Sequence, residues 1–260
     1  MFVWALSERH SVWSSVSRAI RTPSRGENDG RAWLYVVPPL TTANPTDLAM
    51  KVEYQGSPEF KSETLVSYES GYRGNLTNRF WIDAAAYYNI YDGIIMGQVG
   101  QPVPPDAQHP YITIPFRPYN GGSVKSYGME ITADFQLSPS IRTKMAYSYG
   151  HGEKLKAVSE ISAGSFYLPR HQLSLQLNTS PARWIELGYW IRFVDEIAEG
   201  PVPSYWTLDS RLAISLTKQL EFALIGKDLL EKQHQEFQSD LNNVYSEPER
   251  RIVGSLTWRY

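Results

Sequence analysis

The chain has 260 residues, with 8 Trp, 17 Tyr, 9 Phe, no cysteine and a formal charge of −2. This composition excludes a disordered chain, a disulfide scaffold, a zinc-ribbon site and a cysteine nucleophile. A charge so close to zero gives no electrostatic reason to expect a nucleic-acid partner.

The first residues, MFVWALSERHSVW, do not form a secretory signal, because they lack a basic start and Glu8 interrupts the short apolar run. No later stretch reaches the ~18 consecutive apolar residues of a membrane-spanning helix. We therefore expect neither a signal peptide nor a transmembrane helix in this sequence.

Apolar and polar residues alternate along most of the chain, which is the two-residue period of a β-strand. Ala84 and Tyr88 share a face with Ile82, whereas Asp83 and Asn89 lie on the other face. A helix, with its period of about 3.6 residues, would mix these faces. The alternation predicts a partial strand in residues 1–6 and strands at about 10–20, 60–72, 77–93, 122–137, 140–151, 166–179, 182–195, 204–217, 219–228 and 248–260.

The connections between these strands are alternately short and long. The short ones carry turn residues at Gly74-Asn75, Ser138-Pro139, Ser180-Pro181 and Lys218, and a turn from Ser7 to His10 would follow the partial strand. The pattern predicts an antiparallel meander with tight turns at one end and long loops at the other. The long loops are expected at about 21–59, 94–121, 152–165, 196–203 and 229–247.

Two architectures use alternating strands of this kind. A soluble sandwich usually has strands of about 5–6 residues. A transmembrane barrel needs about 9–11 residues per tilted strand, points the apolar face at lipid, and joins short turns on one side to long loops on the other. The strand lengths, the loop asymmetry and the aromatic content favour an all-β, antiparallel up-and-down transmembrane barrel.

Charged residues fall on the polar face of the strands. They could mark a permeation path, but we expect them mainly to form cross-strand pairs on a wet inner wall, since a lipid-facing charge costs about 2–4 kcal/mol at the membrane midplane. These residues are Glu63, Asp83, Glu130, Asp134, Arg142, Lys144, Glu186, Arg192, Asp209 and Arg211.

No catalytic or metal-binding motif is found. A zincin pair, a G-x-S-x-G elbow and a P-loop are all lacking, so we expect no enzyme, no cofactor and no bound metal. The five histidines are expected to be solvated or hydrogen-bonded, and they are His10, His109, His151, His171 and His234.

Two of the long loops carry aromatic residues beside prolines. Trp33 and Tyr35 lie in the first long loop, and Tyr111, Phe116 and Tyr119 lie in the second. Exposed aromatics on a stiffened loop can stack on a ligand, or they can simply pack the loops together. These five residues are the candidate ligand-binding residues.

Several segments resemble the barrel of TonB-dependent outer-membrane receptors. They are VSRAIRTPSR at 16–25, FKSETLVSYESGYR at 60–73, DAAAYYNIYDGI at 83–94, SYGMEITADF at 126–135, PSYWTLDSRLA at 203–213, IGKDLLEKQHQEF at 225–237 and the terminal TWRY. The resemblance implies a receptor for a scarce, bulky nutrient, with a ferric siderophore as the expected ligand, in a barrel of roughly 22 strands around a plug.

With about 10–11 strands, residues 1–260 resemble the C-terminal part of such a barrel, without the plug domain and the TonB box. The resemblance then implies outer-membrane lipid around the barrel, contact with TonB only through the missing parts, and insertion by the barrel-assembly machinery. The last strand, with Leu256, Trp258 and Tyr260, resembles the aromatic-ended signal for that machinery, although the family more often ends in Phe. A fragment that cannot transport alone is expected, and the alternatives are a small passive porin or adhesin and a membrane hydrolase.

Overall fold

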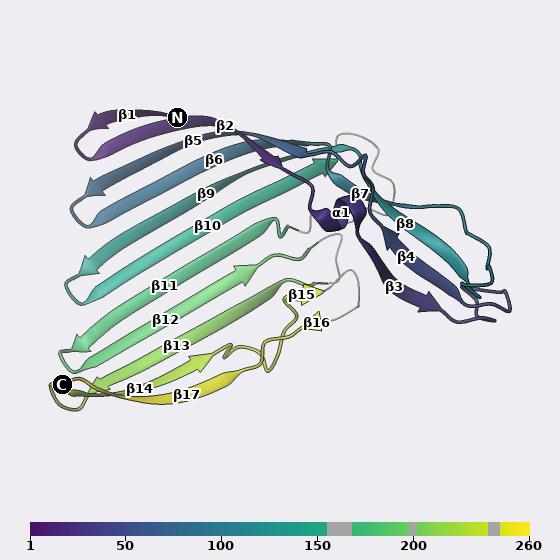
Figure 1. Ribbon diagram of the computed structural model, residues 1–260. Helices are drawn as coiled ribbons and strands as arrows, with labels where there is room; N and C mark the ends of the chain where they lie inside the picture. The colour runs from purple at the N-terminus through teal and green to yellow at the C-terminus, as the bar shows by residue number, and fades with distance from the viewer. Residues whose placement is uncertain (155–167, 198–201, 239–244) are drawn as a thin grey trace.

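The computed structural model covers residues 1–260, and the structure describes residues 1–154, 168–197, 202–238 and 245–260. Most of these residues lie in one curved sheet, with a smaller sheet projecting from one end of it (Figure 1). We call the large sheet the wall and the small sheet, together with the short helix beside it, the arm.

The wall has eleven strands in the order β1-β2-β5-β6-β9-β10-β11-β12-β13-β14-β17. Every neighbouring pair is antiparallel, so the wall is an up-and-down meander as expected. The strands are β1 (Phe2–Ser7), β2 (His10–Arg21), β5 (Glu63–Thr77), β6 (Phe80–Asp92), β9 (Ser123–Ser138), β10 (Ile141–Lys154), β11 (His171–Ala182), β12 (Ile185–Val194), β13 (Tyr205–Ser215), β14 (Leu220–Lys227) and β17 (Arg251–Trp258).

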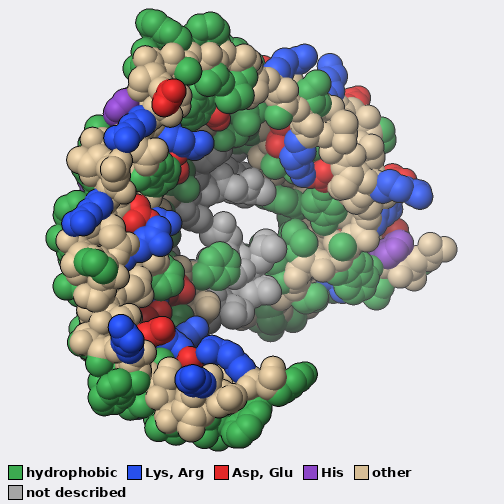
Figure 2. All heavy atoms as spheres, turned by 90° about the vertical axis from the view of Figure 1, so that its left-hand side faces the viewer, with side chains coloured by type: hydrophobic (Ala, Val, Ile, Leu, Met, Phe, Trp, Pro, Cys, Tyr) green, Lys and Arg blue, Asp and Glu red, His purple; other side chains and the backbone are tan. Residues whose placement is uncertain are grey.

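The register of the wall explains why the sequence alternates. Ile82 lies opposite Ala133, which in turn lies opposite Met145, so apolar residues form rows across neighbouring strands. The apolar face is not covered: Met145 is 50% exposed and Trp206 is 45% exposed. In Figure 2 the wall curves around a hollow, with charged side chains along the hollow side and hydrophobic ones on the outside. A single curved layer with an apolar outer face suits an apolar surrounding rather than a packed core.

The strand predictions are confirmed along the wall, but two of the predicted turns are wrong. Gly74 and Asn75 lie within β5, paired with Ile82 and Trp81, and the chain turns only after Thr77. Ser180-Pro181 likewise lies inside β11, where an irregularity in the register absorbs it. In both hairpins the strands are longer than predicted. The pairing therefore continues past the turn-like residues, and the chain turns a few residues nearer the end of the wall.

The arm corrects the prediction that 21–59 and 94–121 are loops. Its four strands, in the order β3-β4-β8-β7, include a parallel pair between β4 and β8. Prolines within β8 and a bulge within β3 interrupt the alternation that identified the wall strands. The elements are α1 (Arg25–Asp29), β3 (Arg31–Val37), β4 (Met50–Gln55), β7 (Ile95–Val99) and β8 (Ile112–Asn120).

The remaining elements are small. β15 (Phe237–Gln238) pairs with β16 (Tyr245–Ser246) in the last long connection. The predicted strand residues 166 and 167 and much of the predicted loop 152–165 fall outside the described part of the chain. No helix in the described ranges has the length and apolar character to cross a membrane.

Candidate functional site

Two of the five candidate ligand-binding residues lie together on the arm. The Trp33 and Tyr111 rings are 5.8 Å apart, edge to face, and the Lys51 ammonium lies 3.6 Å from the Trp33 ring centre and 3.5 Å from the Tyr111 ring centre. Trp33 is 59% exposed, so this group faces solvent. We call Trp33, Lys51 and Tyr111 the aromatic cluster.

Tyr35 and Phe116 lie on the opposite face of the arm. Tyr35 pairs across the sheet with Val52, and Phe116 pairs with Tyr54, whereas Trp33 pairs with Glu53 on the face of the aromatic cluster. The bulge between Trp33 and Tyr35 keeps Tyr35 off the face that simple alternation would give it. Candidate residues that are close in sequence are therefore divided between two surfaces.

Tyr119 lines a third location, near the base of the arm. It borders an open cleft of about 720 Å³ together with Arg31, Gln55, Glu59 and Arg117. The Arg117 guanidinium donates to the Gln55 side chain, at 3.0 Å from Nη2, which fixes one wall of the cleft. The cleft offers hydrogen-bonding groups of both charges.

The arm is fixed to the wall by a buried glutamate. Glu27 in α1 accepts hydrogen bonds from the Ser24 backbone N–H at 2.7 Å and from the guanidinium of Arg21, which ends β2. Arg21 also pairs with Glu63 of β5 at 3.4 Å. Burial disfavours the charged carboxylate, but the hydrogen bonds from Ser24 and Arg21 outweigh it and hold the pKa of Glu27 below its ordinary value.

A second junction lies between β8 and the start of β5. The Asn120 amide donates to the backbone carbonyls of Lys61, at 2.7 Å, and Gly93, at 2.8 Å. Gly93 directly follows β6 and Gly122 directly precedes β9, and both have positive φ, at 66° and 72°. The chain leaves the wall for the arm at Gly93 and returns to the wall at Gly122. The direction of the arm is therefore set by specific contacts at both of its bases.

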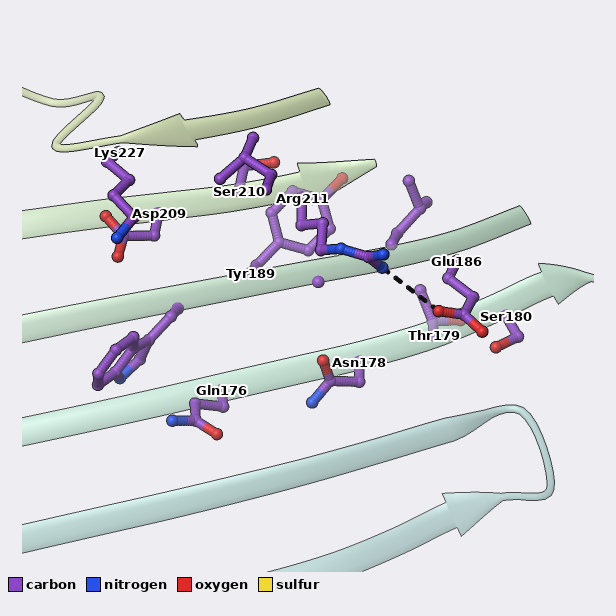
Figure 3. Close-up of a pocket in the computed structure, with 14 residues that line it drawn as sticks. Gln176, Asn178, Thr179, Ser180, Glu186, Tyr189, Asp209, Ser210, Arg211 and Lys227 are labelled. Carbon is purple, nitrogen blue, oxygen red and sulfur yellow. Dashed lines mark hydrogen bonds and ion pairs between the residues drawn. The ribbon is translucent and has the colours of Figure 1, made fainter. Parts of the chain in front are cut away.

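The hollow face of the wall carries the charged residues expected there. Arg142 donates to Asp134 at 2.7 Å, and Arg211 pairs with Glu186 at 3.3 Å and with Glu221 at 2.7 Å. Figure 3 shows the Arg211–Glu186 pair in a groove of about 490 Å³, together with amide and hydroxyl side chains. Cross-strand pairing is confirmed for most of these residues.

A denser network lies nearer the long-loop end of this face. Arg192 donates to Thr207 at 2.9 Å, lies 3.3 Å from Asp209 and 3.8 Å from Asp228, and stacks on the Trp190 ring. Glu130 and Lys144, by contrast, form no ion pair within the part of the chain that the structure describes. Most charges on this wall are thus neutralised locally.

Four of the five histidines have hydrogen-bonding partners, as expected, and His151 lies 3.5 Å from the Glu153 carboxylate. His10 contacts Tyr72, His109 contacts Asp106, and His171 contacts Tyr147. His234 is buried, contacts Glu236 at 2.9 Å, and its ring lies 4.6 Å from the Tyr205 ring at a tilt of 33°. Across residues 1–154, 168–197, 202–238 and 245–260, no three His, Asp or Glu side chains converge on a metal-binding position.

Sequence reasoning missed Lys51 and Glu27. The motif S-R-G-E at 24–27 is a capping-box pattern, and it could have predicted α1 and the buried Glu27. No comparable signal marks Lys51, because its contact with Trp33 and Tyr111 depends on pairing between segments far apart in sequence.

A family model described as "TonB dependent receptor-like, beta-barrel" matches residues 2–229. A curated relative, the ferrioxamine B receptor of Salmonella typhimurium (strain SL1344), is 29% identical in a 161-residue alignment that covers 56% of this chain and 23% of that protein. The chain therefore spans less than a quarter of this relative.

Solved structures share the fold. The siderophore receptor PirA from Acinetobacter baumannii superposes with a TM-score of 0.70 at 16% identity, and a mutant of the ferric enterobactin receptor PfeA from Pseudomonas aeruginosa with 0.68 at 16%. These matches cover 98% of this chain but only 40% and 39% of the two receptors.

Proposed function

The chain belongs to the TonB-dependent receptors, in the part that forms their β-barrel, and on this premise we propose that it serves in the uptake of a ferric siderophore across the outer membrane. The observation that carries the proposal is the family match together with the relative named a ferrioxamine B receptor. The exposed aromatic residues on the arm support it, since they offer flat apolar surfaces to a bulky ligand.

The wall suits a membrane-spanning role. The wall strands from β2 to β13 have 10 to 16 residues, and a tilted transmembrane strand needs about 9–11. Their uncovered apolar face would contact outer-membrane lipid, and the paired charges would line the lumen. The arm, at the long-loop end, would then lie outside the cell, as long loops do in such barrels.

We assign residues 1–260 to the C-terminal part of a larger barrel. The strands alternate in direction through an eleven-stranded order, so β1 and β17 run the same way. Closing the wall on itself, or joining two copies in one orientation, would need a parallel seam. An additional sheet with an odd number of strands would close the barrel with antiparallel pairs only. The plug and the TonB box would belong to the complete receptor, outside residues 1–260.

The proposed ligand contacts remain the five aromatic residues of the arm. Trp33 and Tyr111 would act together, while Tyr35, Phe116 and Tyr119 would contact other parts of a large ligand or other segments of the receptor. Iron would arrive already chelated, since a siderophore supplies its own ligands. TonB would act only through the plug. The barrel-assembly machinery would recognise β17.

We propose no catalytic role for the chain, in keeping with a family of receptors. The histidines that a hydrolase would need at the rim are already paired with neighbouring side chains. In a hybrid receptor that contains this chain, replacing His151, His171 and His234 with Ala is therefore expected to leave siderophore uptake unchanged. A loss of uptake with normal amounts of protein in the membrane would contradict this assignment.

The uptake proposal can be tested with a hybrid receptor. The chain replaces the matching barrel segment of the Salmonella ferrioxamine B receptor, and uptake of radioactive iron is measured with ferrioxamine B and with ferric enterobactin. We expect uptake of one of them in cells with TonB and none in cells without TonB, with the unmodified receptor as control. Uptake that does not depend on TonB would favour a passive pore, and a correctly inserted hybrid that takes up neither compound would contradict the proposal.

A further inference from the structure

The aromatic cluster already holds a cation. The Lys51 ammonium lies over both rings, at 3.6 Å from the Trp33 centre and 3.5 Å from the Tyr111 centre. Both distances are well inside the range of about 6 Å over which a cation is attracted to an aromatic face. Two rings from separate segments, Trp33 in β3 and Tyr111 just before β8, therefore form a two-sided site that accommodates an ammonium group.

Acidic groups stand beside this site. Glu53 lies directly across the sheet from Trp33. On the other side, the His109 ring meets the Tyr111 ring edge to face at 5.7 Å, and Asp106 accepts hydrogen bonds from the His109 ring and backbone. Both carboxylates make the surroundings of the two rings favourable to positive charge.

Lys51 is held weakly. It forms no ion pair with any carboxylate in the described ranges, and its long flexible stem can swing toward water without breaking the sheet. Trp33 is 59% exposed, so the site can be reached from outside. An incoming cation of the same chemistry could take the position of the lysine.

We propose that Trp33 and Tyr111 form an ammonium subsite, filled by Lys51 in the free protein and by a primary ammonium group of the ferric chelate when the ligand binds. The inference rests on the proposed function, because it names the class of siderophore that the arm prefers. The class is a chelate with a free, protonated amine outside its iron-binding groups.

The test compares two ligands that differ only in that amine. One is a ferric trihydroxamate with a terminal primary amine, and the other is the same chelate with the amine acetylated. Binding is measured to the hybrid receptor described above, in outer-membrane preparations. In Lys51→Met, where the subsite is vacant, we expect the free amine to bind about 2–5-fold more tightly than the acetylated chelate, which is the effect of an exposed cation–π contact of about 0.5–1 kcal/mol. In the native sequence we expect a smaller ratio, because the ligand must displace Lys51 from the same two rings. Equal affinity for the two chelates in Lys51→Met would overturn the subsite and leave the proposed function intact, whereas binding of neither chelate would contradict the proposed function itself.

Variants separate this site from general aromatic contact. Trp33→Leu is expected to bring the affinity ratio of the two chelates to about one, and Lys51→Met to increase the ratio, because the site is then vacant. Tyr35→Leu is the matched control, an equally exposed aromatic on the same strand but on the other face, and it should leave the ratio unchanged. A ratio that responds to Tyr35→Leu as it does to Trp33→Leu would overturn the proposal.

A spectroscopic readout does not depend on affinity. The methylene protons of Lys51 should be shifted by the ring currents of Trp33 and Tyr111 in the free protein. Saturating amine-bearing chelate should return them to ordinary positions, and the acetylated chelate should not. Unmoved signals with both chelates would show that no ligand amine replaces the lysine.

Discussion

Glu27 connects the arm to the wall through a single carboxylate. It is the third residue of α1, it completes the capping box with Ser24, and it pairs with Arg21 at the end of β2. Removing its charge would leave Arg21 with only the longer contact to Glu63. The orientation of the arm, and with it the position of the aromatic cluster, depends on this residue.

We expect Glu27→Gln to loosen the arm without unfolding the wall. A hydrogen bond to a charged group contributes about 1.5–3 kcal/mol, and the amide retains part of it, so a loss of about 1–2 kcal/mol is expected. Hydrogen exchange should quicken in α1 and at residues 56–60 and stay unchanged in β9 and β10. Glu59→Gln is the control, since Glu59 is exposed and has no partner in the described part of the chain. Equal effects of both variants would contradict the role of Glu27.

The same residue predicts how pH affects the arm. The pKa of Glu27 is lowered in the folded protein, so its stabilisation is complete above the ordinary glutamate pKa of about 4.3. It is lost as the pH falls through the lowered pKa. Protease cleavage within residues 22–62 should therefore increase at acidic pH in the native chain, while Glu27→Gln should show this sensitivity already at neutral pH. Cleavage that is independent of pH in both proteins would contradict the assignment.

At the scale of single strands, close packing on the wall depends on glycine at particular positions. A Cβ atom on Gly128 would lie 2.2 Å from the Tyr149 carbonyl oxygen and 2.6 Å from the Tyr87 hydroxyl. A Cβ on Gly254 would meet only Phe222, at 3.8 Å. The first position is therefore closed to a larger residue and the second is open.

Gly128→Ala is expected to destabilise the wall by about 1–3 kcal/mol, because β10 must move to admit the methyl group. Gly254→Ala, the matched control, should change stability by less than about 0.5 kcal/mol. Urea unfolding of protein refolded in detergent micelles measures both. Similar midpoints for the two variants would show that the spacing between β9 and β10 is not as tight as described.

The wall strands could be predicted from sequence because apolar residues occupy one face and polar residues the other along each strand. The alternation is seen in the row of apolar residues formed across three strands by Ile82, Ala133 and Met145. The arm has no such constraint, since residues such as Trp33 and Tyr35 are exposed on both faces, and Pro115 and Pro118 lie within β8. Its strands therefore leave no two-residue period to detect.

The candidate site was only partly predictable for a related reason. Aromatic residues in the two long connections could be identified by type, but their grouping depends on the parallel pairing of β4 with β8. That pairing puts Lys51 beside Tyr111 and leaves Phe116 on the other face. Nothing in the local sequence of either segment specifies it.

At the scale of the whole molecule, the unpaired edges of β1 and β17 determine what the wall can be. Unsatisfied backbone groups cost several kcal/mol each in lipid, so both edges must pair. Because the two edge strands run in the same direction, closing the wall on itself requires a parallel pair between β1 and β17, whereas every other pair in the wall is antiparallel. This geometry favours a part of a larger barrel over a small porin.

The most direct test is chemical crosslinking between the two edges in the membrane, in the hybrid receptor that supplies the other strands. The chain has no cysteine, so Trp4→Cys on β1 and Leu256→Cys on β17 can be introduced together and treated with a short bis-maleimide. Ala133→Cys with Met145→Cys, which face each other on neighbouring strands, is the positive control. With crosslinked peptides identified by mass spectrometry, the control pair should link and the edge pair should not, because other strands separate the edges in the complete barrel. A link between β1 and β17, within one chain or between two copies, would contradict the assignment of this wall to a larger receptor.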